Sequence, residues 1–406
     1  MRALDRLRLW QTHCMPVINT ASGVQQPDPG KLPSAARFGW LDVIKGISIL
    51  WVVIFHTYKT RETGYPWVLD PGYFGLFMGH CQPDSWLQSV GCSLGSLFVA
   101  VTSLGFHAVD VFLVASGFGL TYAMRIDGPQ PNWLRWYGKR LVRLFPMYWL
   151  AHLIYLVSPF VARLEALDYR FLLSFLGDRI YPIDSTFYYA NASWWYFGLL
   201  LQLYLVFPLL FILLRKTGIT RFLLCAGLIT LATREVLLQG LEISGLYLAG
   251  GFFGTRLWQF ALGMALAALA RSKPQQLEEM LFSPWTLLAG IVIYGLALAS
   301  NFVSGAYVVT EPLVGTGLFI LLAHLARAVG HWRRLTALLA FVGAYSYGLY
   351  LLHQPYVIYF GAHMGDVGIV TYMLWSIPVI ALITICSIAL ERWVNRLSQS
   401  VAARFG

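Results

Sequence analysis

The chain has 406 residues, of which 58% are hydrophobic and only 12% carry a charged side chain. A soluble domain usually carries about 25% charged residues, so this composition excludes most soluble classes of protein. The net charge of +10 indicates basic cytoplasmic loops rather than nucleic-acid binding, because lysine and arginine collect on the cytoplasmic side of membrane proteins. Apolar runs of about 20 residues, long enough to cross a bilayer as helices, recur along the whole chain.

Taken in order, the runs predict an all-α, polytopic bundle of about ten transmembrane helices. Residues 1–36 are polar and rich in proline, which predicts a cytoplasmic arm rather than a cleaved signal peptide. A single transmembrane domain is predicted over 37–396, with an external loop at about 163–193 and a short cytoplasmic tail at 397–406. The predicted spans, the second of them tilted or broken near Gly105, are 38–58, 94–122, 145–162, 194–214, 219–239, 251–270, 285–303, 311–330, 336–360 and 369–391.

The basic residues set the predicted orientation. With both termini in the cytoplasm, the clusters at 125–143, 215–221, 327–334 and 392–404 all fall inside, as the positive-inside rule requires. An odd number of spans would place the last cluster outside. The sequence therefore predicts an even number of spans and two cytoplasmic termini.

Five cysteines form neither a CxxC pair nor a metal-ligand spacing, so no metal is expected. Cys81 and Cys92 flank a predicted external loop. A disulfide between them would require an oxidising compartment, and a pair of free thiols is the alternative.

The first span carries three ionisable residues on one helix face. His56 follows Lys45 by eleven residues, which is about 20° past three full turns and about 16 Å along the axis. Asp42 lies one turn before Lys45 and can pair with it. Ionisable groups within a membrane indicate function: a histidine can take a proton from a hydroxyl, and a lysine can hold a phosphate. The competing interpretation is that Lys45 only snorkels to the interface and His56 caps the external helix end.

The second span contains an acid, Asp110, followed by Ser116 and Gly117. A buried carboxylate needs a partner, for which Lys45 and His107 are the candidates. Gly117 permits close approach of a helix or a ligand. Helix packing is therefore the alternative to a substrate role for Ser116.

A pair of arginines, Arg140 and Arg143, lies one turn apart where the third span begins at Pro146. The rigid donor fork of arginine suits phosphate recognition. A plain cytoplasmic cluster of basic residues is the alternative.

The ninth span carries a polar stripe. Ser346, Tyr350 and His353 are separated by four and three residues, so they share one face of a helix. Such a stripe within an apolar helix is expected to face the bundle interior, unless the alignment is fortuitous.

These segments follow one another in the order of known family motifs. They are Asp42-x-x-Lys45-Gly46 with His56, Asp110 to Phe118, Arg140-x-x-Arg143-x-x-Pro146, Trp195 to Leu209, Phe260 to Met264, Ser346 to His353, and Glu391-Arg392. Together they resemble the acyltransferase 3 family of membrane proteins over nearly the whole chain. The sequence departs from the family pattern at Lys45, where arginine is commoner, at Leu113 in place of a phenylalanine, and at Gln202, where an acid is frequent.

The resemblance implies an O-acyltransferase of a bacterial inner membrane. Such enzymes move an acyl group, often acetyl or succinyl, from cytoplasmic acyl-CoA to a hydroxyl on a carbohydrate or glycolipid. The implied partners are therefore the lipid bilayer, the acyl-CoA donor and the acceptor, and a homo-oligomer is compatible with the sequence.

The resemblance also assigns roles to residues. The implied catalytic group is His56 with Lys45 and Asp42, in which His56 is the base or a transient acyl carrier oriented by Asp42 or Asp110. The residues expected to hold acyl-CoA are Arg140, Arg143 and Lys45. Those expected to line the substrate cavity are Asp110, Ser116, Tyr350 and His353.

Two other functions fit a polytopic membrane protein. One is a non-enzymatic exporter or flippase of a polysaccharide or glycolipid, which would tolerate loss of His56 better than loss of cavity aromatics. The other is an assembly partner with a degenerate site. The family spacing of Lys45 and His56 argues against the assembly partner.

Overall fold

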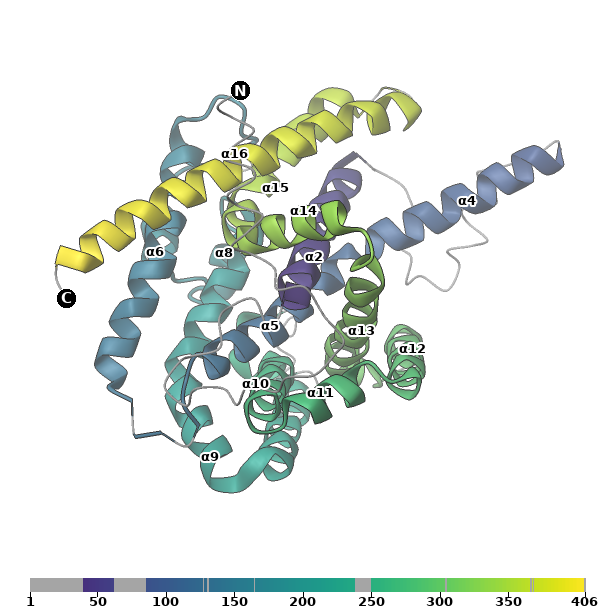
Figure 1. Ribbon diagram of the computed structural model, residues 1–406. Coiled ribbons are helices and arrows are strands. Elements are labelled where there is room, and N and C mark those ends of the chain that lie inside the picture. Colours follow the sequence, from purple (N-terminus) through teal and green to yellow (C-terminus); the bar gives the residue numbers. More distant parts are fainter. Residues whose placement is uncertain are drawn as a thin grey trace, which may run out of the picture.

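The computed structural model (Figure 1) describes residues 39–61, 85–126, 128–129, 131–163, 165–237, 250–303, 305–365, 367 and 369–404. Every regular element within these ranges is helical, which confirms the all-α fold class. The predicted arm 1–36, Cys81 and the side chain of Cys92 lie outside the described residues, and so does the choice between a Cys81–Cys92 disulfide and two free thiols.

The helices follow the predicted spans closely in chain order. The elements are α2 (Gly39–Arg61), α4 (Trp86–Ser103), η2 (Leu104–His107), α5 (Ala108–Tyr122), α6 (Trp133–Val157), α7 (Tyr169–Leu176), α8 (Ile183–Thr186), η3 (Ala192–Trp194), α9 (Trp195–Glu235), η6 (Phe253–Arg256), α10 (Leu257–Ser272), α11 (Pro274–Leu281), α12 (Pro284–Ser300), α13 (Tyr307–Val329), α14 (Arg333–Ala344), α15 (Ser346–Met364) and α16 (Ile369–Arg404).

Five helical stretches of the described chain are long and apolar enough to cross a membrane, or up to seven if each of two bent helix pairs forms one span. The five are Gly39–Lys59, Ser93–Tyr122, Ala192–Glu235, Tyr307–Val329 and Thr371–Ser400. These helices give the chain the architecture of a polytopic membrane protein. Ten spans and two cytoplasmic termini remain predictions.

Two predicted spans contain a break, and a further break separates two others. The second is interrupted by η2, as expected near Gly105, where an added Cβ would lie 2.5 Å from the Trp51 carbonyl oxygen of α2. The fourth and fifth are the two arms of α9, which part at Gly218 with φ 77°, a conformation that glycine adopts readily. The ninth, predicted as one helix over 336–360, is two helices bent by 79° at Tyr345.

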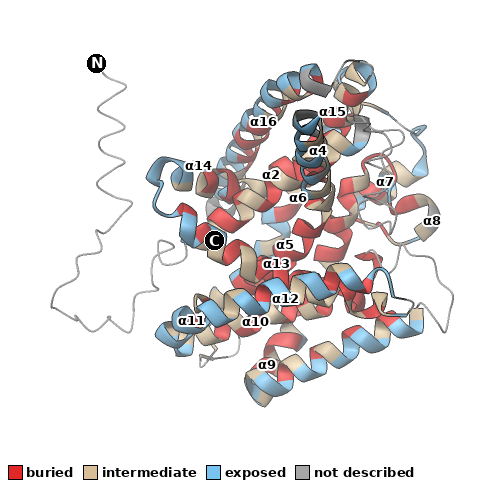
Figure 2. Cartoon of the chain, turned by 90° about the vertical axis from the view of Figure 1, so that its right-hand side faces the viewer, coloured by how far each residue is buried: buried red, intermediate tan, exposed pale blue. Residues whose placement is uncertain are grey.

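The centre of the bundle is α5, and nearly all of its side chains are buried (Figure 2). It meets α10 backbone to backbone. A Cβ atom at Gly117 would lie 2.0 Å from the Phe260 carbonyl oxygen, and one at Gly263 would lie 1.9 Å from that of Val114. Of the two uses predicted for Gly117, helix packing is therefore the one that the structure displays.

A second pair of glycines joins α2 to α14. A Cβ atom at Gly46 would lie 2.0 Å from the Leu339 carbonyl oxygen, and one at Gly343 would lie 1.9 Å from that of Asp42. The contact fixes the part of α2 that carries Asp42 and Lys45 against the helix that precedes the bend at Tyr345.

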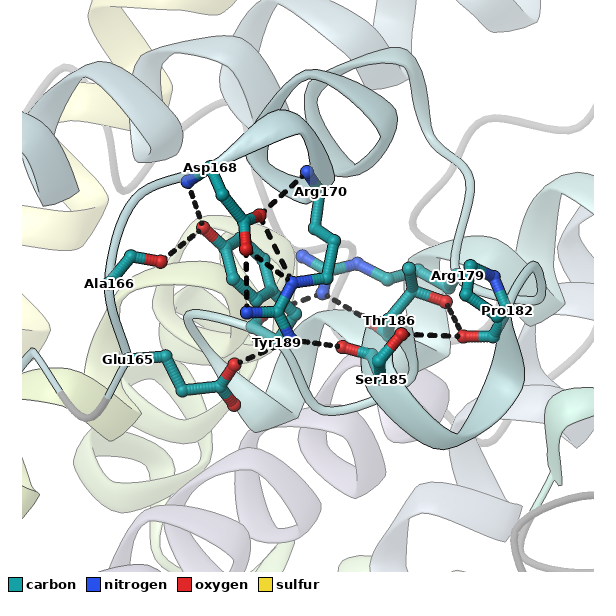
Figure 3. A network of polar contacts seen from close by, with 9 residues as sticks. All are labelled: Glu165, Ala166, Asp168, Arg170, Arg179, Pro182, Ser185, Thr186 and Tyr189. Atoms are coloured by element: carbon teal, nitrogen blue, oxygen red, sulfur yellow. Dashed lines mark hydrogen bonds and ion pairs between the residues drawn. The ribbon is translucent and has the colours of Figure 1, made fainter.

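The segment between α6 and α9 was predicted as a loop, but it contains the short helices α7 and α8 and a polar network (Figure 3). Arg170 Nε donates to Asp168 Oδ2 at 2.9 Å, and this hydrogen bond lowers the pKa of the Asp168 carboxyl. Arg179 is buried and donates to the Tyr189 carbonyl oxygen at 2.7 Å. Hydrogen bonds to backbone carbonyls allow a cation to be buried. We call the ordered segment between α6 and α9, residues 158–194, the cap segment.

The cap segment is attached to α15. Asn191 Nδ2 and Trp194 Nε1 both donate to the Leu351 carbonyl oxygen, at 3.0 Å and 2.9 Å. The Ser193 backbone N–H donates to Gln354 Oε1. These bonds hold the middle of α15, on both sides of His353, at a fixed position in the bundle.

Candidate active site

A cavity of about 370 Å³ opens among α2, α5, α6, α9, α14, α15 and α16. We call it the cation-lined cavity, because Lys45, Arg140 and Arg143 all contribute to its wall. Its full lining is Lys45, Phe112, Ala115, Ser116, Gly119, Leu120, Ala123, Arg140, Arg143, Leu144, Tyr196, Leu200, Tyr204, Gly343, Ala344, Ser346, Tyr347, Tyr350, Glu391 and Asn395.

The three cations come from two helices. Lys45 is in the first half of α2, where its Nζ lies 2.6 Å from Asp42 Oδ1, so the predicted pairing of these two residues is confirmed. Arg140 and Arg143 are in the first half of α6, and the Arg140 guanidinium lies 5.5 Å from the centre of the Trp136 ring. The buried Nε of Arg140 has no hydrogen-bond partner within the described chain. The wall therefore presents concentrated positive charge with unused donor capacity.

An acidic residue of α16, Glu391, also lines the cavity. Glu391 Oε2 accepts a hydrogen bond of 2.7 Å from the backbone N–H of Gly348, in the first turn of α15. The first N–H groups of a helix have no partner within the helix, so a carboxylate satisfies them and is favoured by the helix dipole. In the sequence, Glu391 is noted only as part of the Glu391-Arg392 motif and not as a cavity residue. Its position as an acid in a long apolar run could have marked it as a cavity residue.

The polar stripe predicted for the ninth span lies on α15, but its members have different surroundings. Ser346 and Tyr350 line the cation-lined cavity, as does Ser116 from α5. His353 is fully buried and lies outside the described lining, with its ring centre 5.8 Å from that of Tyr350. Tyr350 therefore adjoins both the cavity and His353.

His353 meets the other histidine that the sequence singled out. Nε2 of His353 lies 3.1 Å from Nδ1 of His56, and the two ring centres are 5.0 Å apart. We call these residues the histidine pair. His56 is half-buried, whereas His353 is completely enclosed. The sequence predicts that His353 lines the cavity in which His56 acts, but it does not predict the direct contact of the two rings.

Asp110 has partners other than those expected. Lys45 pairs with Asp42, and His107 Nδ1 lies 2.9 Å from the hydroxyl of Tyr294. Asp110 accepts hydrogen bonds from Arg256 and, at 2.9 Å, from Gln259 Nε2.

The Asp110 network extends to two further helices and lies outside the lining of the cation-lined cavity. Arg256 Nη2 is 3.8 Å from Glu311 Oε1, and Arg234 pairs with Glu311. The network thus joins α5, α9, η6 and α13. Its alternating charges are the compensation that ionisable groups require in an apolar interior.

Replacing Arg256 with leucine is expected to destabilise the protein by about 3–5 kcal/mol, because it removes the closest cation from a buried carboxylate. Arg256 and Asp110 are 8% and 2% exposed, so water cannot take the place of the cation. The measurement is the midpoint of thermal unfolding in one detergent, with the exposed Lys139→Leu on α6 as control. Adding Asp110→Asn should restore part of the loss. Equal midpoints for the Arg256 and Lys139 variants would contradict the assignment.

These features define a class of protein: an integral membrane bundle that contains a polar, cationic cavity and, next to one of its lining residues, a pair of histidines in contact. A family model described as an acyltransferase domain matches residues 38–393, so the chain belongs to this family and is a membrane acyltransferase. The resemblance deduced from the ordered motifs is thereby confirmed. No curated protein matches the chain. No solved structure matches it either.

Proposed function

We propose that this protein transfers an acetyl or succinyl group from cytoplasmic acyl-CoA to a hydroxyl of a carbohydrate or glycolipid. The observation that carries the proposal is the cation-lined cavity, which brings Lys45, Arg140 and Arg143 together one aromatic side chain away from the histidine pair. A cationic cavity suits a donor with several phosphates, and a histidine suits activation of a hydroxyl.

The donor binds with its phosphates on Arg140, Arg143 and Lys45. Arginine offers paired donors to phosphate oxygens, and lysine adds a point charge. The cavity lies in the halves of α6 and α16 that carry the basic clusters 125–143 and 392–404, and the positive-inside rule places such clusters in the cytoplasm. This geometry supports a donor that arrives from the cytoplasm. The bacterial inner membrane is proposed as the location of the chain on the ground of the family alone.

The acyl group then extends past Tyr350 towards the histidine pair. His56 takes the proton of the acceptor hydroxyl as the hydroxyl oxygen attacks the thioester carbonyl carbon. A carbon–oxygen bond forms, the carbon–sulfur bond breaks, and the proton passes from His56 to the thiolate of CoA. Lys45 and His56 are about 16 Å apart along α2. That separation fits a donor whose phosphates and thioester lie at opposite ends of a long arm.

The half-buried position of His56 supports an acceptor that approaches from the side of the membrane opposite the cation-lined cavity. A membrane-bound glycan or glycolipid would meet the acyl group there.

The test is acyl transfer by the purified protein in nanodiscs. Labelled acetyl-CoA and succinyl-CoA are supplied with membrane extract as the source of acceptor, and CoA release and incorporated label are measured. Donor-dependent release of CoA supports the proposal. Absence of both CoA binding and CoA release in folded protein would contradict it and favour the exporter or flippase.

Replacing Arg143 with alanine is expected to raise KM for acetyl-CoA about 10- to 100-fold with little change in kcat. A charge-assisted hydrogen bond contributes about 1.5–3 kcal/mol, which corresponds to that factor in affinity. The matched control is Arg135→Ala, an exposed arginine on the same helix that lies outside the described lining. An unchanged KM for the Arg143 variant would remove this residue from the donor site.

A further inference from the structure

The ring of His353 is held in one protonation pattern by its own helix. Its Nδ1 lies 3.0 Å from the Leu349 carbonyl oxygen and 2.9 Å from that of Tyr350. Carbonyl oxygens can only accept hydrogen bonds, so Nδ1 carries the proton. In the neutral imidazole, the lone pair is then on Nε2, the atom that faces His56.

The same reasoning extends to His56. Its Nδ1 lies 3.0 Å from the Val52 carbonyl oxygen and 3.1 Å from Nε2 of His353. Both neighbours are acceptors, so Nδ1 of His56 is a donor to both. The opposite tautomer would direct a lone pair of His56 at two other lone pairs. The lone pair of neutral His56 is therefore on Nε2, as a general base requires.

The position of His353 is itself fixed from outside its helix. The cap segment bonds to Leu351, two residues before His353, and to Gln354, the residue after it. His353 is fully buried, whereas His56 is half-buried, so His56 is the ring of the pair that is open to a substrate. His353 can therefore influence the reaction only through its contact with His56.

We infer that His353 is a positioning residue that sets the tautomer of His56 and accepts its Nδ1–H throughout the reaction, a conclusion that rests on the proposed function. The contact that assigns this role is the 3.1 Å approach of the two rings across α2 and α15. When His56 Nε2 takes the hydroxyl proton, the resulting imidazolium donates more strongly from Nδ1 to His353. His56 then returns the proton to the thiolate, and His353 neither gains nor loses a proton over the cycle.

The test compares two variants of similar size and shape. His353→Gln keeps an acceptor oxygen near the position of Nε2, whereas His353→Met places no comparable acceptor there. We expect His353→Met to lower kcat about 100-fold with KM for acetyl-CoA unchanged. The reason is that His56 is no longer held in the tautomer with its lone pair on Nε2, while the donor site is intact. His353→Gln should recover at least about 10-fold of that loss. Equal kcat values for the two variants, or a wild-type kcat for His353→Met, would overturn the inference.

A second measurement determines the tautomers directly in the wild-type protein and does not depend on enzyme activity. In protein labelled with ¹⁵N-histidine, the nitrogen chemical shifts distinguish a ring protonated on Nδ1 from one protonated on Nε2. We expect His56 and His353 both to be protonated on Nδ1. A wild-type His56 protonated on Nε2 would overturn the inference even if the His353 variants fail to fold. If the wild type releases no CoA, the proposed function fails, and the tautomer measurement still decides the pairing.

Discussion

Replacing His56 with alanine is expected to lower the rate of acyl transfer by at least about 100-fold, because it removes the group that takes the proton of the acceptor hydroxyl. Binding of the donor should not change, since His56 lies outside the lining that contains Lys45, Arg140 and Arg143. The measurements are CoA release and label incorporation in nanodiscs, together with equilibrium binding of acetyl-CoA to the same preparations.

The matched control is His363→Ala, an exposed histidine on α15. Its variant should transfer acyl groups at the wild-type rate. Full transfer activity of the His56 variant at normal expression would show that another residue acts as the base. Loss of donor binding together with transfer would instead place His56 in the donor site, contrary to the geometry of the cation-lined cavity.

The second large effect is expected at the contact between α5 and α10. Gly263→Ala should destabilise the protein by about 1–3 kcal/mol, because the added methyl group would meet the Val114 carbonyl oxygen at 1.9 Å. A backbone atom cannot rotate away as a side chain can, so the two helices must move apart. Because α5 is the central helix, the displacement also shifts Ser116 and Phe112 in the cavity wall. The measurement is the midpoint of thermal unfolding in detergent.

Gly119→Ala provides the control within α5, since no heavy atom lies within 4 Å of an added Cβ there. That variant should be as stable as the wild type or more so, because alanine favours a helix over glycine by about 1 kcal/mol. Gly117→Ala should resemble Gly263→Ala, and the double variant should cost less than the sum, since both changes separate the same helices. Equal midpoints for Gly263→Ala and Gly119→Ala would contradict the packing argument.

The sequence predicted the features that depend on local chain properties. Apolar runs and their spacing located the helices, and Gly105 marked a real break in the second one. The pairing of Asp42 with Lys45 was also predictable, because the two residues are one turn apart on the same helix. The motif order identified the family, and charge together with helix periodicity selected Lys45 and Arg143 as cavity candidates.

The bend at Tyr345 was not predictable in this way, since neither proline nor glycine occupies that position. The bend leaves the first N–H groups of α15 without a partner in their own helix. Glu391, a distant residue on α16, accepts a hydrogen bond from one of them, the N–H of Gly348. The hydrogen-bond partner of the first turn of α15 is thus supplied from another part of the chain. No local signal near residue 345 carries that information.

The sequence by itself determined the apolar helices, the family and part of the cavity wall, because these follow from hydrophobic length, helix periodicity and motif order. The residues of the wall that it selected are Lys45, Ser116, Arg140, Arg143, Ser346 and Tyr350. Only the tertiary structure decided which residues meet: Arg256 rather than Lys45 for Asp110, and His353 for His56. The physical reason is that contacts between helices depend on how closely and at which height the helices pack. Backbone contacts at glycines and buried ion pairs together set the distance between two helices and their relative height. Neither kind of contact can be recognised from the hydrophobic periodicity of one helix.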